Sequence, residues 1–102
     1  MLALRPNCEL CDVDLPPAAL NARICSYECT FCEECVDNVL GNVCPNCGGG
    51  FVPRPIRPAY EWRPGTGLRH DPPDSERRRV RYSTEEVESL TRRLRDVPPE
   101  RR

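Results

Sequence analysis

All eight cysteines of this 102-residue chain lie in its first half and form four closely spaced pairs. The pairs are Cys8 with Cys11, Cys25 with Cys29, Cys32 with Cys35, and Cys44 with Cys47. Zinc prefers four tetrahedral thiolate or imidazole ligands, and a gap of two residues lets two sulfur atoms reach one ion. Four pairs therefore predict two complete metal sites with no cysteine left over.

The residue that follows each pair indicates the local backbone. Asp12 follows the first pair and Gly48 the last, and both residues tolerate the positive φ of a sharp metal-binding turn. Val36 follows the third pair and does not tolerate it. Apolar residues at helical spacing and then Gly41 come next, so the third pair should open a helix that ends at Gly41. A metal-binding turn paired with the start of a helix is a treble-clef site.

Two ways of sharing the ions remain open. In the sequential arrangement, the first and second pairs share one ion, and the third and fourth pairs share the other. The helix would then carry the chain about 7–8 Å from Cys35 to Leu40, and the four residue steps to Cys44, which span at most roughly 14 Å, would have to bring it back. The interleaved one needs no return and is favoured. It assigns site 1 to Cys8, Cys11, Cys32 and Cys35, and site 2 to Cys25, Cys29, Cys44 and Cys47.

The cysteine order resembles a RING finger in which Cys29 replaces the usual histidine, and Leu10, Phe31 and Pro45 stand where RING domains carry similar residues. The segment from Met1 to Gly49 also resembles the bacterial family called domain of unknown function 1272. That resemblance implies a small bacterial zinc-type protein without a known activity. In RING ligases, the residues at the positions of Leu10 and Pro45 help to hold the ubiquitin-conjugating enzyme.

Residues 21–25 and 27–31 could form a short hairpin. The predicted core is small: Leu10, Ile24, Tyr27, Phe31, Val36, Val39 and Leu40. So little apolar area does not stabilise a fifty-residue domain. Bound zinc would decide the balance, at about 10–16 kcal/mol for each structural site. The expected fold is a small metal-stabilised α+β, two-zinc treble-clef or RING-like module over residues 1–50.

The second half of the chain has a different composition. Residues 51–82 are rich in proline and arginine and should form a disordered linker. Within it, Tyr60 and Trp62 either dock a partner or pack back on the module, and His70 should be a solvated loop residue. An amphipathic helix is predicted over residues 83–97, started by a capping box of Ser83 and Glu86 and followed by a tail at 98–102. Its narrow apolar stripe could dock on the module, on a second copy or on a partner.

Charge is divided between the halves. Residues 1–50 carry seven acids and two arginines, whereas residues 51–102 carry nine acids and thirteen arginines. An anionic module is a poor reader of phosphate backbones, so nucleic acid is not the expected partner, although the arginine run at 77–81 leaves that alternative open.

The expected function is structural zinc binding that presents a protein-interaction surface. The alternatives are a thiol redox switch, a nucleic-acid-associated regulator and a ubiquitin-ligase-like protein, with iron a minor alternative to two Zn²⁺ ions. No catalytic constellation is visible, so the chain is not expected to be an enzyme. It lacks both a secretory signal and an apolar run of the roughly 20 residues needed to span a bilayer, which favours a cytoplasmic location.

Overall fold

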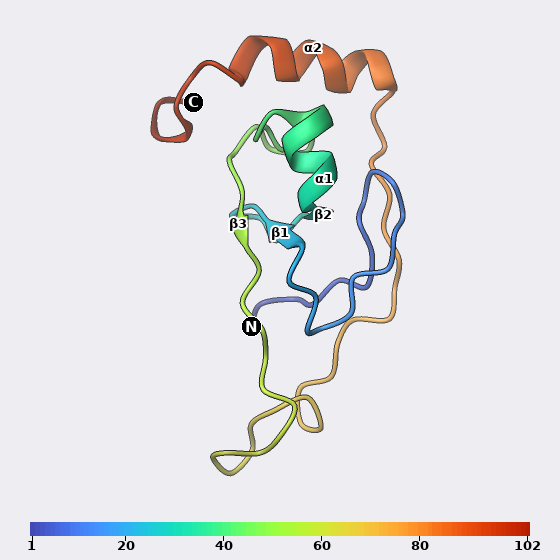
Figure 1. The fold of residues 1–102 in the computed structure, drawn as a ribbon, viewed down its shortest axis with the longest axis vertical. Helices are drawn as coiled ribbons and strands as arrows, with labels where there is room; N and C mark the ends of the chain where they lie inside the picture. Colours follow the sequence, from blue (N-terminus) through green and yellow to red (C-terminus); the bar gives the residue numbers. More distant parts are fainter.

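The computed structural model describes residues 1–102 as an elongated molecule of 46 × 26 × 19 Å. Its short strands and helices gather toward one end, and an arm of loops extends from the other (Figure 1). The elements in chain order are β1 (Ala22–Ile24), β2 (Thr30–Cys32), α1 (Glu33–Cys35), the π-helical turn η1 (Val36–Leu40), β3 (Val52–Pro53), α2 (Thr84–Leu94) and the 3₁₀ turn η2 (Pro99–Arg101).

The three strands form one antiparallel sheet in the order β2-β1-β3. Strands β1 and β2 pair Ala22 with Cys32 and Ile24 with Thr30, so a hairpin is present as expected, although its second strand begins at Thr30 and not at Tyr27. Its turn contains Glu28 at φ 66°, a left-handed conformation. The hairpin positions three cysteines, because two of them flank the turn and the third ends β2.

The predicted turn chemistry is confirmed. Cys32 is the N-cap of α1, and its Sγ accepts a hydrogen bond from the backbone N–H of Cys35 at 3.5 Å. Gly41 ends the following turn at φ 56°. Asp12 and Gly48 have φ of 68° and 79°, as expected after metal-binding turns.

The core is a cluster of twelve buried residues, and half of them are cysteines. Phe31, Val36 and Leu40 belong to it as expected. The expectation was wrong for Tyr27 and Val39, whose exposed fractions are 72% and 51%. Tyr27 lies in the hairpin turn, and Val39 faces outward from η1. The list of expected core residues also missed Leu15 and Val43, which are each only 1% exposed.

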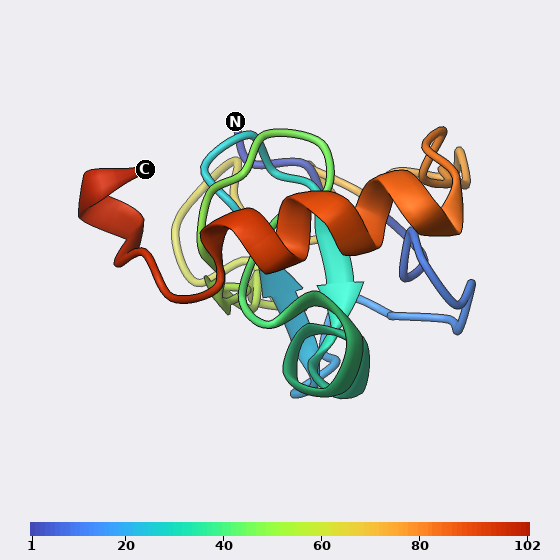
Figure 2. The same cartoon turned by 90° about the horizontal axis from the view of Figure 1, so that it is seen from above.

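Helix α2 lies across the end of the module, where it contacts η1 (Figures 1 and 2). Its capping box is present, but the helix ends at Leu94 with Arg95 as C-cap, three residues before the predicted end. The apolar stripe docks on the chain's own module, where Val87 is buried and the Thr91 hydroxyl donates to the carbonyl of Leu40 at 3.4 Å.

Beyond β3, residues 54–82 contain no helix or strand. Tyr60 and Trp62 are 74% and 75% exposed on the arm, so the alternative that they pack back on the module is wrong. His70 is exposed as expected and pairs with Glu61. Whether residues 51–82 behave as a linker stays a prediction. None of the helices combines the length and the apolar character required to span a membrane.

Candidate metal centres

Four thiols converge at the first centre. The sulfur atoms of Cys8, Cys11, Cys32 and Cys35 all lie within 4.8 Å of one another. The first two come from the turn that precedes Asp12, and the others come from the end of β2 and the first turn of α1. This is the grouping of the interleaved arrangement.

The spacing of these sulfurs suits a tetrahedral metal ion. The Sγ atoms of Cys11 and Cys32 are 3.8 Å apart. In a regular tetrahedron with Zn–S bonds of about 2.3 Å, neighbouring sulfurs are separated by about 3.8 Å. The group could therefore hold one ion without rearrangement of this pair.

The second centre contains Cys25, Cys44 and Cys47, whose sulfurs also lie within 4.8 Å of one another. The fourth predicted ligand, Cys29, lies outside that group, although its thiol affects the pKa of both Cys25 and Cys44. The structure therefore brings three predicted ligands into one cluster and leaves Cys29 at its margin.

Because the thiols of each cluster are crowded together, some have a lowered pKa and others a raised pKa. In the second centre, hydrogen bonds from Cys29 and then from Cys44 lower the pKa of Cys25 to about 3. The thiols of Cys25 and Cys29, together with burial, raise the pKa of Cys44. In the first centre, burial and the neighbouring thiols raise the pKa of Cys35. In each cluster, a negative charge on one thiolate therefore makes the next thiol harder to ionise. A divalent cation at the centre would stabilise the thiolates and remove this effect.

Backbone N–H groups point at the sulfurs, as they do around metal-bound thiolates. Tyr27 N–H donates to Cys25 Sγ at 3.4 Å, and Gly49 N–H donates to Cys47 Sγ at 3.4 Å. These donors stabilise negative charge on sulfur and fix the direction of each ligand.

A buried ion pair joins the two centres, and the sequence reasoning missed it. Glu9 lies between the first two ligands of site 1 and is 4% exposed. Its Oε2 accepts from Arg5 Nη1 at 2.9 Å and from the Thr30 backbone N–H at 2.6 Å, while its Oε1 accepts from Asn46 Nδ2 at 3.3 Å. Asn46 stands between the last two cysteines, so one carboxylate holds both metal-binding turns. The i, i+4 spacing of Arg5 and Glu9 was the available signal.

A second buried arginine, also missed, holds the loops behind the centres. Arg54 is 4% exposed and donates to the carbonyl oxygens of Arg5, Leu15 and Pro16 at 2.8, 3.2 and 2.9 Å. Burial lowers the pKa of its guanidinium. No feature of the proline-rich segment distinguished Arg54 from the twelve other arginines of that half.

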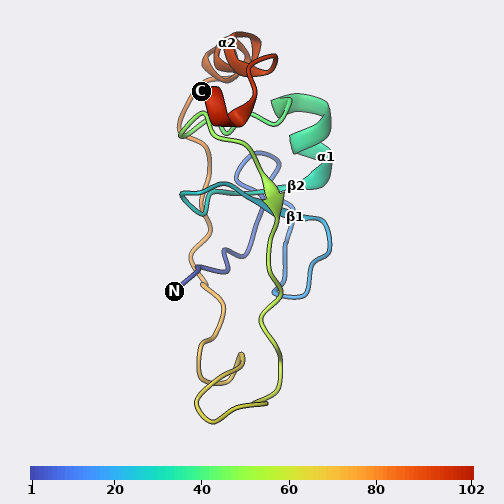
Figure 3. The ribbon, with the colours of Figure 1, turned by 90° about the vertical axis from the view of Figure 1, so that its left-hand side faces the viewer.

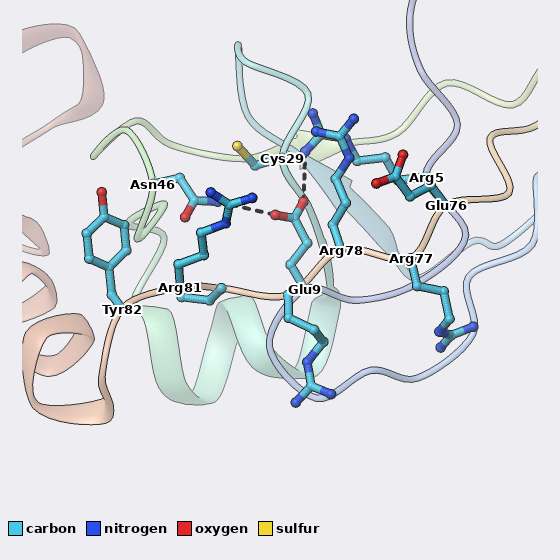
Figure 4. A pocket seen from close by; sticks show the side chains of 11 residues that line it. Arg5, Glu9, Cys29, Asn46, Glu76, Arg77, Arg78, Arg81 and Tyr82 are labelled. Carbon is cyan, nitrogen blue, oxygen red and sulfur yellow. Dashed lines mark hydrogen bonds and ion pairs between the residues drawn. The ribbon is translucent and has the colours of Figure 1, made fainter.

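A cavity of about 640 Å³ lies beside the second centre (Figure 4). Cys29, Arg5 and Glu9 line it on the module side, and residues 76–82 line it on the other. The Glu9 carboxylate and the guanidinium of Arg81 both face this space in Figure 4.

The first half of the chain is similar to known proteins. Residues 1–57 match the family described as "Protein of unknown function (DUF1272)". An uncharacterized protein of Rhizobium meliloti (strain 1021) is 63% identical over 59 residues, which are 58% of this chain and 70% of that relative. No solved structure matches the chain.

Proposed function

This chain belongs to the DUF1272 family of proteins of unknown function, and we propose that its cysteine-rich half is a structural two-zinc module that presents a protein-interaction surface. The observation that carries the proposal is the convergence of two sulfur clusters from sequence-distant pairs. All-thiolate donor sets are typical of structural zinc, and a site closed by four thiolates, which the second centre becomes when Cys29 joins it, leaves no position for a substrate. The protein is accordingly proposed to have no enzymatic activity.

The composition of the core supports a structural role for the metal. Six of the twelve core residues are cysteines, so without an ion the centre of the fold is a set of crowded thiols. Three short strands and a few apolar side chains do not replace that contribution in a domain of this size. Metal binding and folding should therefore be one event.

The local geometry supports the treble-clef assignment at the first centre. A sharp turn through Asp12 supplies two sulfurs, and the N-terminal turn of α1 supplies the others. The RING-like part of the proposal rests on the interleaved grouping, with Cys29 as the fourth ligand of site 2. A shift of its thiol toward the other three sulfurs would complete that set.

Native mass spectrometry of protein purified under reducing conditions tests the metal content. Two zinc ions per chain are expected, and an absorbance spectrum separates colourless zinc from iron. One ion per chain, or no ion with intact disulfides, would contradict the proposal.

Paired substitutions then test how the ions are shared. Replacing Cys8 and Cys11 by serine should expose Cys32 and Cys35 to a thiol-alkylating reagent and leave one zinc in place. The reciprocal variant, with serine at Cys44 and Cys47, should expose the remaining second-centre thiols, Cys25 and Cys29, and protect Cys32 and Cys35. Labelling of Cys25 and Cys29 in the first variant, with one zinc retained, would establish the sequential arrangement instead.

A thiol redox switch is a second candidate function, and the position of Cys29 favours it. This thiol lies outside the three-sulfur group and lines the cavity beside it. Hydrogen peroxide would take two electrons from two thiolates, form a disulfide and be reduced to water with uptake of two protons, and the ion would leave. Zinc release that begins with a disulfide at Cys29 would support this function, whereas release without one would reject it.

The remaining parts of the proposal concern partner and place. A protein partner agrees with an acidic module, and a cytoplasmic location agrees with eight reduced thiols. Ubiquitin-ligase-like activity gains no support, because Pro45 is buried and lines a cavity together with α2 residues such as Leu90.

A further inference from the structure

Residues 74–82, here called the docked segment, lie in an extended conformation along residues 4–14 (Figures 1 and 3). Two backbone hydrogen bonds join them: Asp74 N–H donates to Leu4 O at 3.0 Å, and Val80 N–H donates to Glu9 O at 2.9 Å. The two segments therefore run in the same direction. This is how proteins bind extended peptides, with affinity from the main chain and specificity from individual side chains.

Asn7 recognises the backbone of the docked segment. Its side-chain oxygen accepts from Arg78 N–H at 3.2 Å, and its Nδ2 donates to Arg78 O at 2.8 Å. The same Nδ2 donates to Cys8 O and to Asp12 Oδ1, both at 3.0 Å, and Asn7 is completely buried. The metal-binding turn thus holds this amide in one orientation, and the contact does not depend on the side chain of the bound residue.

Arg77 supplies the side-chain specificity. Its Nη1 donates to Asp14 Oδ1 at 2.6 Å, while its Nη2 donates to the Asp12 backbone carbonyl at 2.6 Å and to Asp12 Oδ1 at 3.0 Å. A planar fork that meets two carboxylates and a carbonyl suits arginine and not lysine. Three residues later, Val80 packs partly buried against the cysteine core. The recognised pattern is an arginine followed at the third position by an apolar residue.

The receiving residues and the bound segment lie in different parts of the chain. Residues 4–14 fall within the part that matches the family, 1–57, whereas the docked segment lies outside it. The first fifty residues also carry five more acids than arginines, which suits a basic ligand. The receiving surface is thus part of the family module, and this chain supplies an occupant of its own.

We propose that residues 4–14 form a peptide-binding groove for an extended segment of another protein that carries arginine three residues before an apolar side chain, and that the docked segment occupies this groove in cis. The inference rests on the proposed function, because it names the interaction surface of the zinc module and the chemistry of its partner. A tethered segment competes at an effective concentration in the millimolar range. A partner therefore binds when its affinity and concentration outweigh those of the tethered segment, or when the docked segment is released.

A competition experiment with the full-length, zinc-loaded protein tests the groove. The probe is a fluorescent peptide with the sequence of residues 73–83, and its binding is followed by anisotropy. Arg77→Asp in the protein weakens the tethered segment and leaves the groove intact, so this variant should bind the peptide at least about tenfold more tightly than the wild type does. Arg92→Asp, at an exposed position of α2 outside the groove, makes the same change of charge and should behave as the wild type.

Changes in the probe and in the groove complete the test. A probe with Arg77→Lys should bind the opened variant about tenfold more weakly, because lysine cannot form the forked contacts. Adding Asp14→Asn to the opened variant should weaken binding of the original probe. The proposal is overturned if the opened variant binds no better than the wild type, or if the lysine probe binds equally well.

Two controls separate this inference from the zinc proposal. Native mass spectrometry counts the ions in every variant, so a missing ion counts against the structural zinc module, and failed peptide binding with two ions present counts against the groove alone. If Arg77→Asp loses metal, Val80→Asp opens the groove by removing the apolar anchor of the tethered segment. A wild-type dimer that dissociates on either substitution would assign the groove to a second copy and overturn the proposal of a foreign partner.

Discussion

Replacing Glu9 by alanine should destabilise the protein by about 3–5 kcal/mol. The carboxylate accepts hydrogen bonds from Arg5, from the Thr30 backbone and from Asn46. Removing it leaves the Arg5 guanidinium, whose side chain is 11% exposed, without its ion-pair partner, and leaves the N–H of the fully buried Thr30 without an acceptor.

The magnitude follows from which groups lose their partners. Breaking a buried ion pair from one side costs about 3–5 kcal/mol, because the remaining charge stays buried and unpaired. Glu9→Gln keeps an acceptor for the Thr30 N–H and loses the charge, so it should cost about 1.5–3 kcal/mol, the range for a hydrogen bond to a charged group. Glu88 is exposed on α2 without a polar partner, and Glu88→Ala should change stability by less than about 0.5 kcal/mol.

Urea unfolding at a fixed free zinc concentration measures the three variants against the wild type. The zinc concentration has to be held constant because ligand binding to the native state adds to its apparent stability. Native mass spectrometry confirms that each folded variant carries the same ions. A loss below about 1 kcal/mol for Glu9→Ala, with both ions present, would refute the argument that this carboxylate ties the two metal-binding turns together.

Two further predictions concern helix ends. Ser83→Ala should lower stability by about 1 kcal/mol in thermal unfolding, because it removes the acceptor of the Glu86 N–H at 3.1 Å; an unchanged midpoint would mean that the cap does not contribute. Gly41→Ala should cost about 1–2 kcal/mol from its positive φ of 56° alone, because its new Cβ would lie at an ordinary contact distance of 3.4 Å from Arg95 Cβ. Gly65→Ala, at φ 79° with no atom within 4 Å, carries the same kind of backbone strain, so a much larger loss for Gly41→Ala would show that its Cβ does not fit.

The parts of the centres that could be predicted depend on local chemistry. Thiol spacing, the turn residues Asp12 and Gly48, and the helix end at Gly41 each act within a few residues, so the sequence alone indicates them. The position of Cys29 depends on more distant features. It follows Glu28, whose left-handed backbone closes the hairpin, and it lines the same cavity as Arg5 from the distant N-terminal segment.

The buried polar residues could not be predicted for a different reason. Hydropathy places Glu9, Asn7 and Arg54 at the surface, yet all three are at most 4% exposed. Each becomes buried because it satisfies polar groups from at least two separate segments at once. Contacts between distant segments arise from the tertiary fold, and they produce no periodic pattern in the sequence. The docking of α2 was similarly open, because an apolar stripe specifies burial and not the surface that provides it.

The acidic first half and the basic second half of the chain form ion pairs with each other, which the sequence alone left undecided. Arg77 and Arg79 pair with acids of the module's first turn, at 2.6 Å to Asp14 and 3.7 Å to Asp12 respectively. Cations engaged in this way are not free to neutralise phosphates, which weakens the case for nucleic-acid binding by the arginine run. Each site of four thiolates and one Zn²⁺ would add two negative charges to the module. Metal loading should therefore hold the docked segment more tightly, and loss of metal should release the arginine run and the groove together.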